Sequence, residues 1–211
     1  MSIGNVRVSF SGSGGVGKTT TLKEANKTLK LPVIKEGVRK YMAENDIDHL
    51  RELAPKDVMK MQLSLLRNKE VTEGGAAFIA DRSTLDNFVY ANQWLSREDS
   101  MQRGLKDYMM DCFKHAAKSY DYIFVFPWGV IPLEDDGVRS AKPMYQLQIQ
   151  MLIERAVHQI QILNPSIYVH VVTASSVEDR AAEVIGVIEN VEKAKTAARD
   201  AAIKDESVTV H

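Results

Sequence analysis

The feature that most constrains the fold is a glycine-rich stretch near the N-terminus, "SGSGGVGKTT" at residues 11–20. Residues 6–10 before it alternate between apolar and polar side chains, which is typical of a β-strand. The residues after it, "TTTLKEANKTLK", favour a helix. The pattern Gly12-x-x-x-x-Gly17-Lys18-Thr19 therefore stands between a strand and a helix, which is the setting of a phosphate-binding P-loop.

In such a loop the glycines let backbone N–H groups turn inward around phosphate oxygens, and the helix N-terminus adds a partial positive charge. We expect Lys18 to reach the β- and γ-phosphates of ATP, and the Thr19 hydroxyl to hold Mg²⁺. A chance glycine-rich turn is the alternative, which the strand and helix on either side disfavour. The expected nucleotide-binding residues are Gly12, Ser13, Gly14, Gly15, Val16, Gly17, Lys18, Thr19 and Thr20.

Short apolar runs alternate with longer amphipathic stretches along the chain, which predicts an α/β fold with a parallel sheet. The expected strands are residues 6–10, 32–35, 76–80, 122–126 and 167–172. The expected helices are residues 18–29, 55–68, 86–95, 101–118 and 145–163, followed by the stretch "SSVEDRAAEVIGVI". We expect one domain over residues 1–192 and a helical or frayed tail over residues 193–211.

Bulk composition sets few limits on the partners. Lys and Arg total 27 against 28 Asp and Glu, so a net charge of −1 neither favours nor excludes nucleic acid. Cys112 is the only cysteine, which excludes an internal disulfide and fits a reducing cytoplasm. No apolar run approaches the roughly 18 residues of a membrane span, and no signal peptide is visible. We therefore expect a cytoplasmic protein with no membrane partner.

GTPase switches, ATPases and kinases all use a P-loop, and other motifs separate them. A guanine-reading switch needs Asn-Lys-x-Asp, whereas the nearest match here, "NKEV" at residues 68–71, ends in Val. AAA-type ATPases usually end the acidic strand in Asp-Glu, whereas "AAFIADRS" ends in Asp81 and Arg82. An Asp-Arg pair at a strand end is the arrangement of nucleoside and nucleotide kinases. The sequence therefore predicts an ATP-dependent kinase, with a nucleotide-hydrolysing switch or a non-catalytic nucleotide-binding module as alternatives.

Phosphoryl transfer needs a carboxylate near the acceptor and positive charge over the transferring group. Asp81 follows a strand at the edge where ligands bind, so it is a candidate for holding Mg²⁺ or accepting a proton, or else caps the next turn. Arg82 is a candidate clamp for the acceptor or the γ-phosphate, or else a structural partner of Asp86. Glu36 is the other candidate base, and it shares a helix face with Arg39 if a helix follows the second strand directly, an exposed ion pair being the alternative.

The stretch "FPWGVIPLEDDGVRSAKP" follows the fourth strand and is rich in proline, glycine and charge. It predicts a lid at about residues 127–144, with a solvated surface loop as the alternative. Arg139 is the first candidate for neutralising transition-state charge from this lid, and Lys142 is the second. Three aromatic residues can stack a base or belong to the core: Tyr90, Trp94 and Trp128.

Together these motifs resemble the small P-loop kinases of the thymidylate kinase and nicotinamide-riboside kinase group. The resemblance covers roughly residues 4–185 and includes "GSGGVGKT", "E-x-x-R", "ADRSTLDNFVY" and "YDYIFVF…P…DDGVR". It implies a five-stranded parallel sheet with helices on both faces and a lid, and MgATP as the donor. It places the acceptor between the second and third strands and the lid, and "TASSVED" near the adenine.

One departure from thymidylate kinases bears on the acceptor. Those enzymes bind the acceptor's phosphate with Arg-Glu-Pro after the second strand, and an aromatic residue usually follows Asp-Arg. This chain has "KEGVRK" and Ser83 at those places, which favours a hydroxyl acceptor on a nucleoside-type group over a monophosphate. Phage kinases that phosphorylate 5-hydroxymethyluracil within DNA are relatives with such an acceptor, while a deoxynucleoside monophosphate kinase and a nicotinamide riboside kinase are the alternatives. The basic residues that could contact DNA are Arg97, Arg103, Lys106 and Lys142.

Overall fold

A computed structural model describes residues 5–130 and 142–208 of the chain. Its five strands form one parallel sheet in the order β2-β3-β1-β4-β5. The strands are β1 (Arg7–Ser11), β2 (Val33–Ile34), β3 (Phe78–Asp81), β4 (Tyr122–Val125) and β5 (Tyr168–Val171). Each overlaps the range predicted for it, and the α/β class with a parallel sheet is confirmed. The inner strands are apolar and buried because both faces of the sheet are covered.

The carboxyl ends of the strands lie at one edge of the sheet. β1 is central and pairs with β3 on one side and with β4 on the other. The register sets Phe10 opposite Asp81, so the loop that follows β1 starts beside the end of β3. β2 pairs with the outer side of β3, which brings the residues after Ile34 to the same edge. This edge is where open α/β sheets bind ligands.

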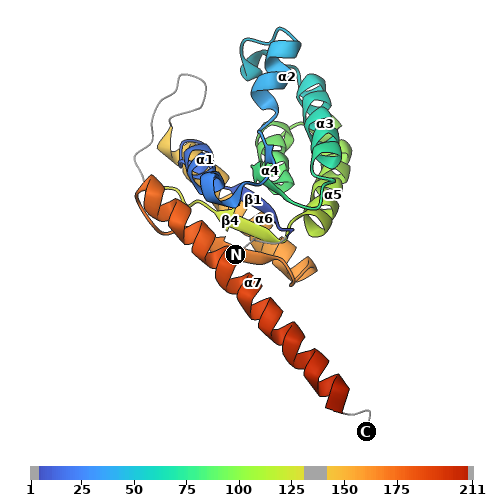
Figure 1. Cartoon of the computed structure of the whole chain (residues 1–211). Coiled ribbons are helices and arrows are strands. Elements are labelled where there is room, and N and C mark those ends of the chain that lie inside the picture. Colours follow the sequence, from blue (N-terminus) through green and yellow to red (C-terminus); the bar gives the residue numbers. More distant parts are fainter. Residues whose placement is uncertain (1–4, 131–141, 209–211) are drawn as a thin grey trace.

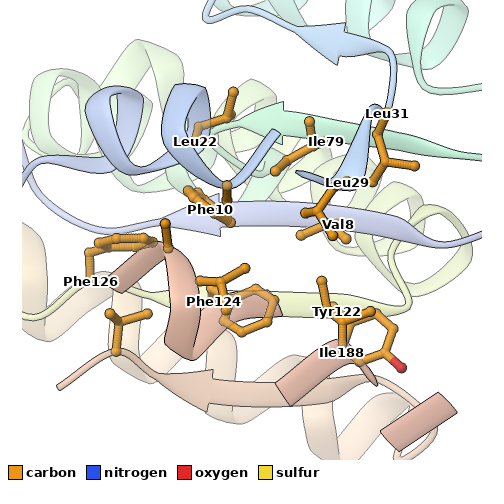
Figure 2. Close-up of a cluster of buried hydrophobic side chains, with 14 of the residues drawn as sticks. Val8, Phe10, Leu22, Leu29, Leu31, Ile79, Tyr122, Phe124, Phe126 and Ile188 are labelled. Atoms are coloured by element: carbon orange, nitrogen blue, oxygen red, sulfur yellow. The ribbon is translucent and has the colours of Figure 1, made fainter. Parts of the chain in front are cut away.

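Two helices cover one face of the sheet, α1 (Lys18–Leu29) and α7 (Val177–Val208) (Figure 1). Figure 2 shows the apolar cluster between them and the strands, with Val8 and Phe10 of β1 against Leu22 of α1 and Ile188 of α7. This packing fixes α1, and therefore the loop that leads into it, against the middle of the sheet.

The other face is covered by α4 (Thr84–Leu95), α5 (Gln102–Ser119) and α6 (Pro143–Leu163). A further helix, α3 (Pro55–Thr72), packs on the outside of α4 and α5 through a smaller apolar cluster. Helices therefore lie on both faces, as predicted. Figure 1 shows the short α2 (Val38–Glu44) at the top of the view, next to α3.

Several helix ends differ from the prediction. α4 begins at Thr84, two residues earlier than predicted, because Ser83 and Asp86 form a capping box that satisfies its first backbone N–H groups. α6 begins at Pro143, since proline fits the first turn of a helix. α7 continues through Val208, so the tail is helical in its described part, where fraying was the other expectation.

Three short elements were not predicted: α2, and the 3-10 turns Leu50–Glu52 and Asp99–Met101. α2 has no buried residue, so it carries no apolar periodicity that a sequence pattern could reveal. In the described parts of the chain, none of the helices has the length and apolar character that crossing a membrane demands.

Candidate active site

The glycine-rich loop connects β1 to α1 and requires its glycines. Gly12, Gly15 and Gly17 have φ angles of 147°, 76° and 77°, a region that other residues rarely adopt. A side chain at Gly17 would also collide with the Arg180 guanidinium, whose Nη1 lies 2.5 Å from an ideal Cβ. The loop conformation therefore depends on these glycines, and the backbone N–H groups at the start of α1 follow the loop directly. This arrangement is the one that a P-loop needs.

Lys18 is buried in this loop. Its Nζ donates hydrogen bonds to the Gly12 oxygen at 2.8 Å and to the Ser13 oxygen at 2.5 Å. Burial lowers the pKa of Lys18 to about 7, and the positive charge of Arg82 contributes in the same direction. An anionic phosphate beside Lys18 would favour the charged form, so the loop offers a phosphate group a close cationic partner.

Three buried side chains accept hydrogen bonds from the N-terminal half of the loop. Gly12 N donates to Asp86 Oδ1 at 3.0 Å. Ser13 N donates to Gln150 Oε1 at 3.0 Å, and Gly14 N donates to Gln146 Oε1 at 2.9 Å. α4 and α6 thus hold the loop from the second face of the sheet. Sequence reasoning missed the two glutamines, whose only signal is their spacing of four residues on the buried side of α6.

Asp81 and Thr19, both predicted as candidates for holding Mg²⁺, are in contact. The Thr19 hydroxyl donates to Asp81 Oδ2 at 2.5 Å. A hydroxyl and a carboxylate are hard oxygen ligands of the kind that Mg²⁺ accepts, so the pair fits a magnesium ion that also contacts nucleotide phosphates. The capping role considered for Asp81 belongs instead to Ser83 and Asp86.

Arg82 and Glu36 meet beside the loop. Arg82 Nε donates to Glu36 Oε1 at 2.8 Å, and Arg82 Nη1 donates to the Gly12 oxygen at 3.2 Å. Asp86 Oδ1 lies 3.5 Å from Nη1, so the ion pair with Asp86 exists alongside the pair with Glu36. Burial alone would lower the pKa of Arg82, but Glu36 and the other nearby acidic groups outweigh burial and raise it well above its usual range. The guanidinium therefore carries a permanent charge between the loop and Glu36.

The shared helix face of Glu36 and Arg39 required a helix directly after the second strand, and this condition is not met. α2 begins only at Val38, so Glu36 precedes the helix and points to Arg82 instead. Both residues nevertheless line the same cavity.

This cavity has a volume of about 630 Å³ and lies next to the glycine-rich loop, which contributes Gly14 to its wall. Tyr90 and Trp94 are among its aromatic residues, and Gln62, Asn87 and Gln146 are its amides. Its charged residues are Glu36, Arg39, Glu52, Arg82 and Lys142. Asp81 and Trp128 do not line it. Glu36 is thus the carboxylate that adjoins both the cavity and Arg82, whereas Asp81 faces Thr19.

Arg180, at the start of α7, holds the loop from the first face of the sheet. Its Nη1 donates to the Val16 oxygen, and its Nε donates to the Ser176 oxygen, each at 3.1 Å. Burial lowers the pKa of this guanidinium. The stretch "TASSVED", expected near the adenine, ends directly before Arg180. It is therefore tied to the P-loop by the hydrogen bond from Arg180 to Val16, a contact that the sequence did not predict.

Other predicted residues lie elsewhere. Arg139 falls within residues 131–141, outside the described residues, as does most of the predicted lid. Arg97, Arg103 and Lys106 are exposed at the turn into α5 and do not line the cavity. Lys142 does line it.

Comparison with protein families places the chain in a class. A family model described as an AAA domain matches residues 7–180, and the chain belongs to this family. AAA-type ATPases usually carry glutamate where this chain has Arg82, which is why the sequence alone favours a kinase. The match shows that the family includes a chain with Asp-Arg at this strand end. A comparison with curated proteins found no match.

Solved structures share the fold. Deoxyadenosine kinase from M. mycoides with bound dATP has 20% sequence identity and a TM-score of 0.61, over 86% of this chain and 98% of that one. NadR protein in complex with NR has 21% identity and a TM-score of 0.57, over 82% of this chain and 47% of that one. NadR protein in complex with NAD and AMP-PNP has 20% identity and a TM-score of 0.60, over 88% of this chain and 49% of that one. The chain spans about half of NadR and nearly all of the deoxyadenosine kinase. The fold is the α/β fold of P-loop kinases, as predicted.

Proposed function

We propose that the protein is an ATP-dependent kinase that transfers the γ-phosphoryl group of MgATP to a hydroxyl of a nucleoside-type acceptor. The observation that carries the proposal is the position of Glu36 and Arg82, which form an ion pair in the wall of a cavity directly beside the P-loop. A nucleotide hydrolase needs a water beside the γ-phosphate, and a cavity of about 630 Å³ there is far larger than a water requires. The solved kinases with bound nucleotides support the same assignment of the P-loop as an ATP site.

The residues divide between donor and acceptor. Lys18 and the backbone N–H groups at the start of α1 bind the phosphates of ATP, and Thr19 and Asp81 hold Mg²⁺. The ion supplies positive charge to the phosphate oxygens. Arg82 lies between the loop and the cavity, where its fixed charge stabilises the transferring group.

Glu36 is our candidate for the general base. Its side chain is 22% exposed, so a ligand in the cavity can reach it, and its pairing with Arg82 orients the carboxylate. In the proposed step, the acceptor hydroxyl gives its proton to Glu36 and its oxygen bonds to the γ-phosphorus. The bond from that phosphorus to the β–γ bridging oxygen breaks, and ADP leaves.

The cavity lining supports a nucleoside-type acceptor. Tyr90 and Trp94 offer aromatic faces on which a base can stack, while Gln62 and Asn87 offer amide donors and acceptors for its polar edge. Gln62 is held by the Tyr108 hydroxyl, which donates to its Oε1 at 3.2 Å. A buried, fixed amide discriminates between polar ligands more strongly than a mobile one.

The particular acceptor that the resemblance favours is 5-hydroxymethyl-deoxyuridine within DNA. Ser83 contributes nothing to this choice, because its hydroxyl caps α4 and accepts a hydrogen bond from Ser11. Lys142 at the cavity wall, with the exposed Arg97, Arg103 and Lys106, is the set of cations that a DNA strand would meet. Binding to DNA would fall with salt, by about 0.7–0.9 log units per phosphate contact per log unit of salt.

Incubation with γ-labelled ATP and separated acceptors tests the proposal. The acceptors are DNA containing 5-hydroxymethyluracil, unmodified DNA, thymidine, deoxyadenosine, thymidine monophosphate and nicotinamide riboside. Label in a nucleoside or in the modified DNA supports the proposal, and the acceptor that takes it identifies the substrate. Label in thymidine monophosphate alone would contradict the hydroxyl acceptor.

The family description favours a second candidate, hydrolysis of ATP without an acceptor. The same experiment separates the two functions. Inorganic phosphate released at a rate that no acceptor changes would support the hydrolase and contradict the kinase.

A further inference from the structure

Arg82 occupies an unusual backbone conformation. Its φ is +78°, in the left-handed region that costs a non-glycine residue about 1–3 kcal/mol. Two other non-glycine residues described by the structure have positive φ, Lys30 and Asp46, and both are exposed at a helix end or in a turn. Arg82 is buried, and it lies at the turn from β3 to α4 where its side chain must reach both Glu36 and Gly12. Something in the surrounding structure has to hold this turn.

Lys69, near the end of α3, contacts that turn directly. Its Nζ donates to the backbone oxygen of Arg82 at 2.7 Å and to Glu73 Oε1 at 2.7 Å. Lys69 is 4% exposed, and water therefore cannot replace these bonds. The backbone oxygen of the strained residue therefore has a buried ammonium group as its partner.

Glu73 is in turn fixed by α5 and the residue after it. The Tyr120 hydroxyl donates to Glu73 Oε2 at 2.7 Å, and His115 Nε2 lies 2.7 Å from the same oxygen. The Tyr120 hydroxyl also accepts a hydrogen bond from Thr84 N at 3.1 Å. One buried carboxylate is therefore linked to the turn twice, through Lys69 to Arg82 and through Tyr120 to Thr84.

The energetics of this network point to positioning. A buried ion pair is weak evidence for stability, because desolvation of both charges offsets their attraction. Replacing a buried ion pair with apolar side chains of similar size is often neutral or stabilising, but apolar side chains could not donate a hydrogen bond to the carbonyl group of a strained turn. The Lys69–Glu73 pair does so at the residue whose guanidinium adjoins the P-loop and the cavity.

We propose that Lys69 is a positioning residue: held by Glu73, its ammonium group fixes the left-handed turn at Arg82 and thereby aims the Arg82 guanidinium between the phosphate loop and the acceptor cavity. The consequence for catalysis rests on the proposed function, in which Arg82 stabilises the transferring phosphoryl group. The consequence for the position of Arg82 does not depend on it.

The position of Arg82 can be measured without any activity. In the NMR spectrum of the arginine side chains, the Nε–Hε group that donates to Glu36 should give a sharp signal that exchanges slowly with water. Lys69→Met should broaden, shift or remove this signal. The matched control, Lys60→Met, changes an exposed lysine on the same helix and should leave the signal unchanged. An unchanged signal in folded Lys69→Met would overturn the proposal.

Loss of stability is separated from loss of position by a second variant. Lys69→Met alone leaves the Glu73 charge without its lysine, and the protein can fail to fold. The double variant Lys69→Met, Glu73→Gln removes both charges and keeps a side chain that can bond to Tyr120. We expect it to regain thermal stability while the Arg82 signal stays perturbed. Recovery of the signal together with stability would show that Lys69 has only a structural role.

Kinetics then test the link to catalysis. Lys69→Met should lower kcat about 10- to 100-fold, because a displacement of about 1 Å at a reacting centre can cost about 100-fold, and should leave the KM for ATP nearly unchanged. In an Arg82→Gln background the same change should cost less than about threefold, since its effect passes through the guanidinium. A full additional loss in that background would overturn the proposal. A wild-type protein with no transfer to any acceptor would instead contradict the proposed function, and the NMR result would still decide the role of Lys69.

Discussion

The backbone of Gly12 contacts three charged side chains of the site, and Gly12→Ala should lower both the unfolding free energy and the transfer activity. Its oxygen accepts hydrogen bonds from Lys18 and Arg82, and its N–H donates to Asp86. An ideal Cβ at this position lies 2.5 Å from the Phe126 oxygen, a separation that real Cβ atoms do not show. Since that oxygen belongs to the backbone beside β4, it cannot move aside as a flexible side chain would.

The cost can be estimated from these two features. The φ of +147° strains a residue other than glycine by about 1–3 kcal/mol. The collision adds an overpacking cost of about 1–3 kcal/mol. Gly12→Ala should therefore lose about 2–6 kcal/mol of unfolding free energy, which lowers the Tm of a chain of this length by roughly 4–24 °C. Transfer activity should fall further than stability, because Lys18 and Arg82 both lose their anchor.

Urea unfolding followed by circular dichroism measures the stability, and Gly186→Ala is the matched control. Gly186 is inside α7, and apart from the adjoining residues and backbone of that helix no atom lies within 4 Å of an ideal Cβ there. Alanine there should stabilise the protein by about 0.5–1 kcal/mol, because glycine is the weaker helix former. If Gly12→Ala were as stable as the wild type while Gly186→Ala behaved as expected, the account of the loop would be refuted.

Three further predictions concern charged residues. Lys18→Ala should abolish transfer and leave the Tm unchanged or higher, because burial already disfavours the lysine charge; wild-type turnover would contradict the phosphate site. Glu36→Gln should lower kcat by about 10²–10⁴-fold with ATP affinity nearly unchanged, as expected for loss of a general base. Asp81→Asn should instead raise the Mg²⁺ concentration needed for half-maximal rate. A magnesium titration in which Glu36→Gln raises that concentration and Asp81→Asn does not would exchange the two roles. Burial raises the pKa of Glu73, but Lys69 and the hydrogen bonds outweigh burial, so the net shift is downward from 4.5. The ionised carboxylate therefore stabilises the fold above that pH, and this stabilisation is lost as the pH falls below it. Urea unfolding between about pH 3 and 6 should therefore show a steeper loss of stability in the wild type than in Glu73→Gln, and equal slopes would rule out this linkage.

The sequence predicted the parallel sheet and the grouping of Lys18, Thr19 and Asp81 at one edge of it, because these features depend on local patterns. The P-loop is contiguous, and its strand and helix are strongly marked. Asp81 and Thr19 could be paired because the carboxyl ends of adjacent parallel strands meet at one edge. Asp81 and Arg82 are adjacent in the sequence, so a local motif was enough to predict the edge of the sheet at which the site lies.

The supporting residues could not be predicted, because their partners are distant in sequence. Gln146 and Gln150 meet the loop across more than 130 residues. In the sequence, Lys69 belongs only to "NKEV", which does not match a guanine-reading motif, although its ammonium group contacts the backbone oxygen of Arg82. The position of Ser83 after Asp-Arg favours a hydroxyl acceptor on sequence grounds, whereas its hydroxyl caps α4. Such contacts depend on tertiary packing, and a single sequence carries no local signal for them.

In the proposed function, the phosphoryl group goes to a hydroxyl bound in the cavity beside Glu36 and Arg82. A ³¹P NMR spectrum of the protein with MgATP and the acceptor that takes label tests it most directly, because the product's phosphorus reports its own chemistry. The account predicts ADP together with a new phosphomonoester, formed by the wild type and absent with Lys18→Ala. Inorganic phosphate as the only product besides ADP, or a new diphosphate formed from a nucleoside monophosphate, would contradict it.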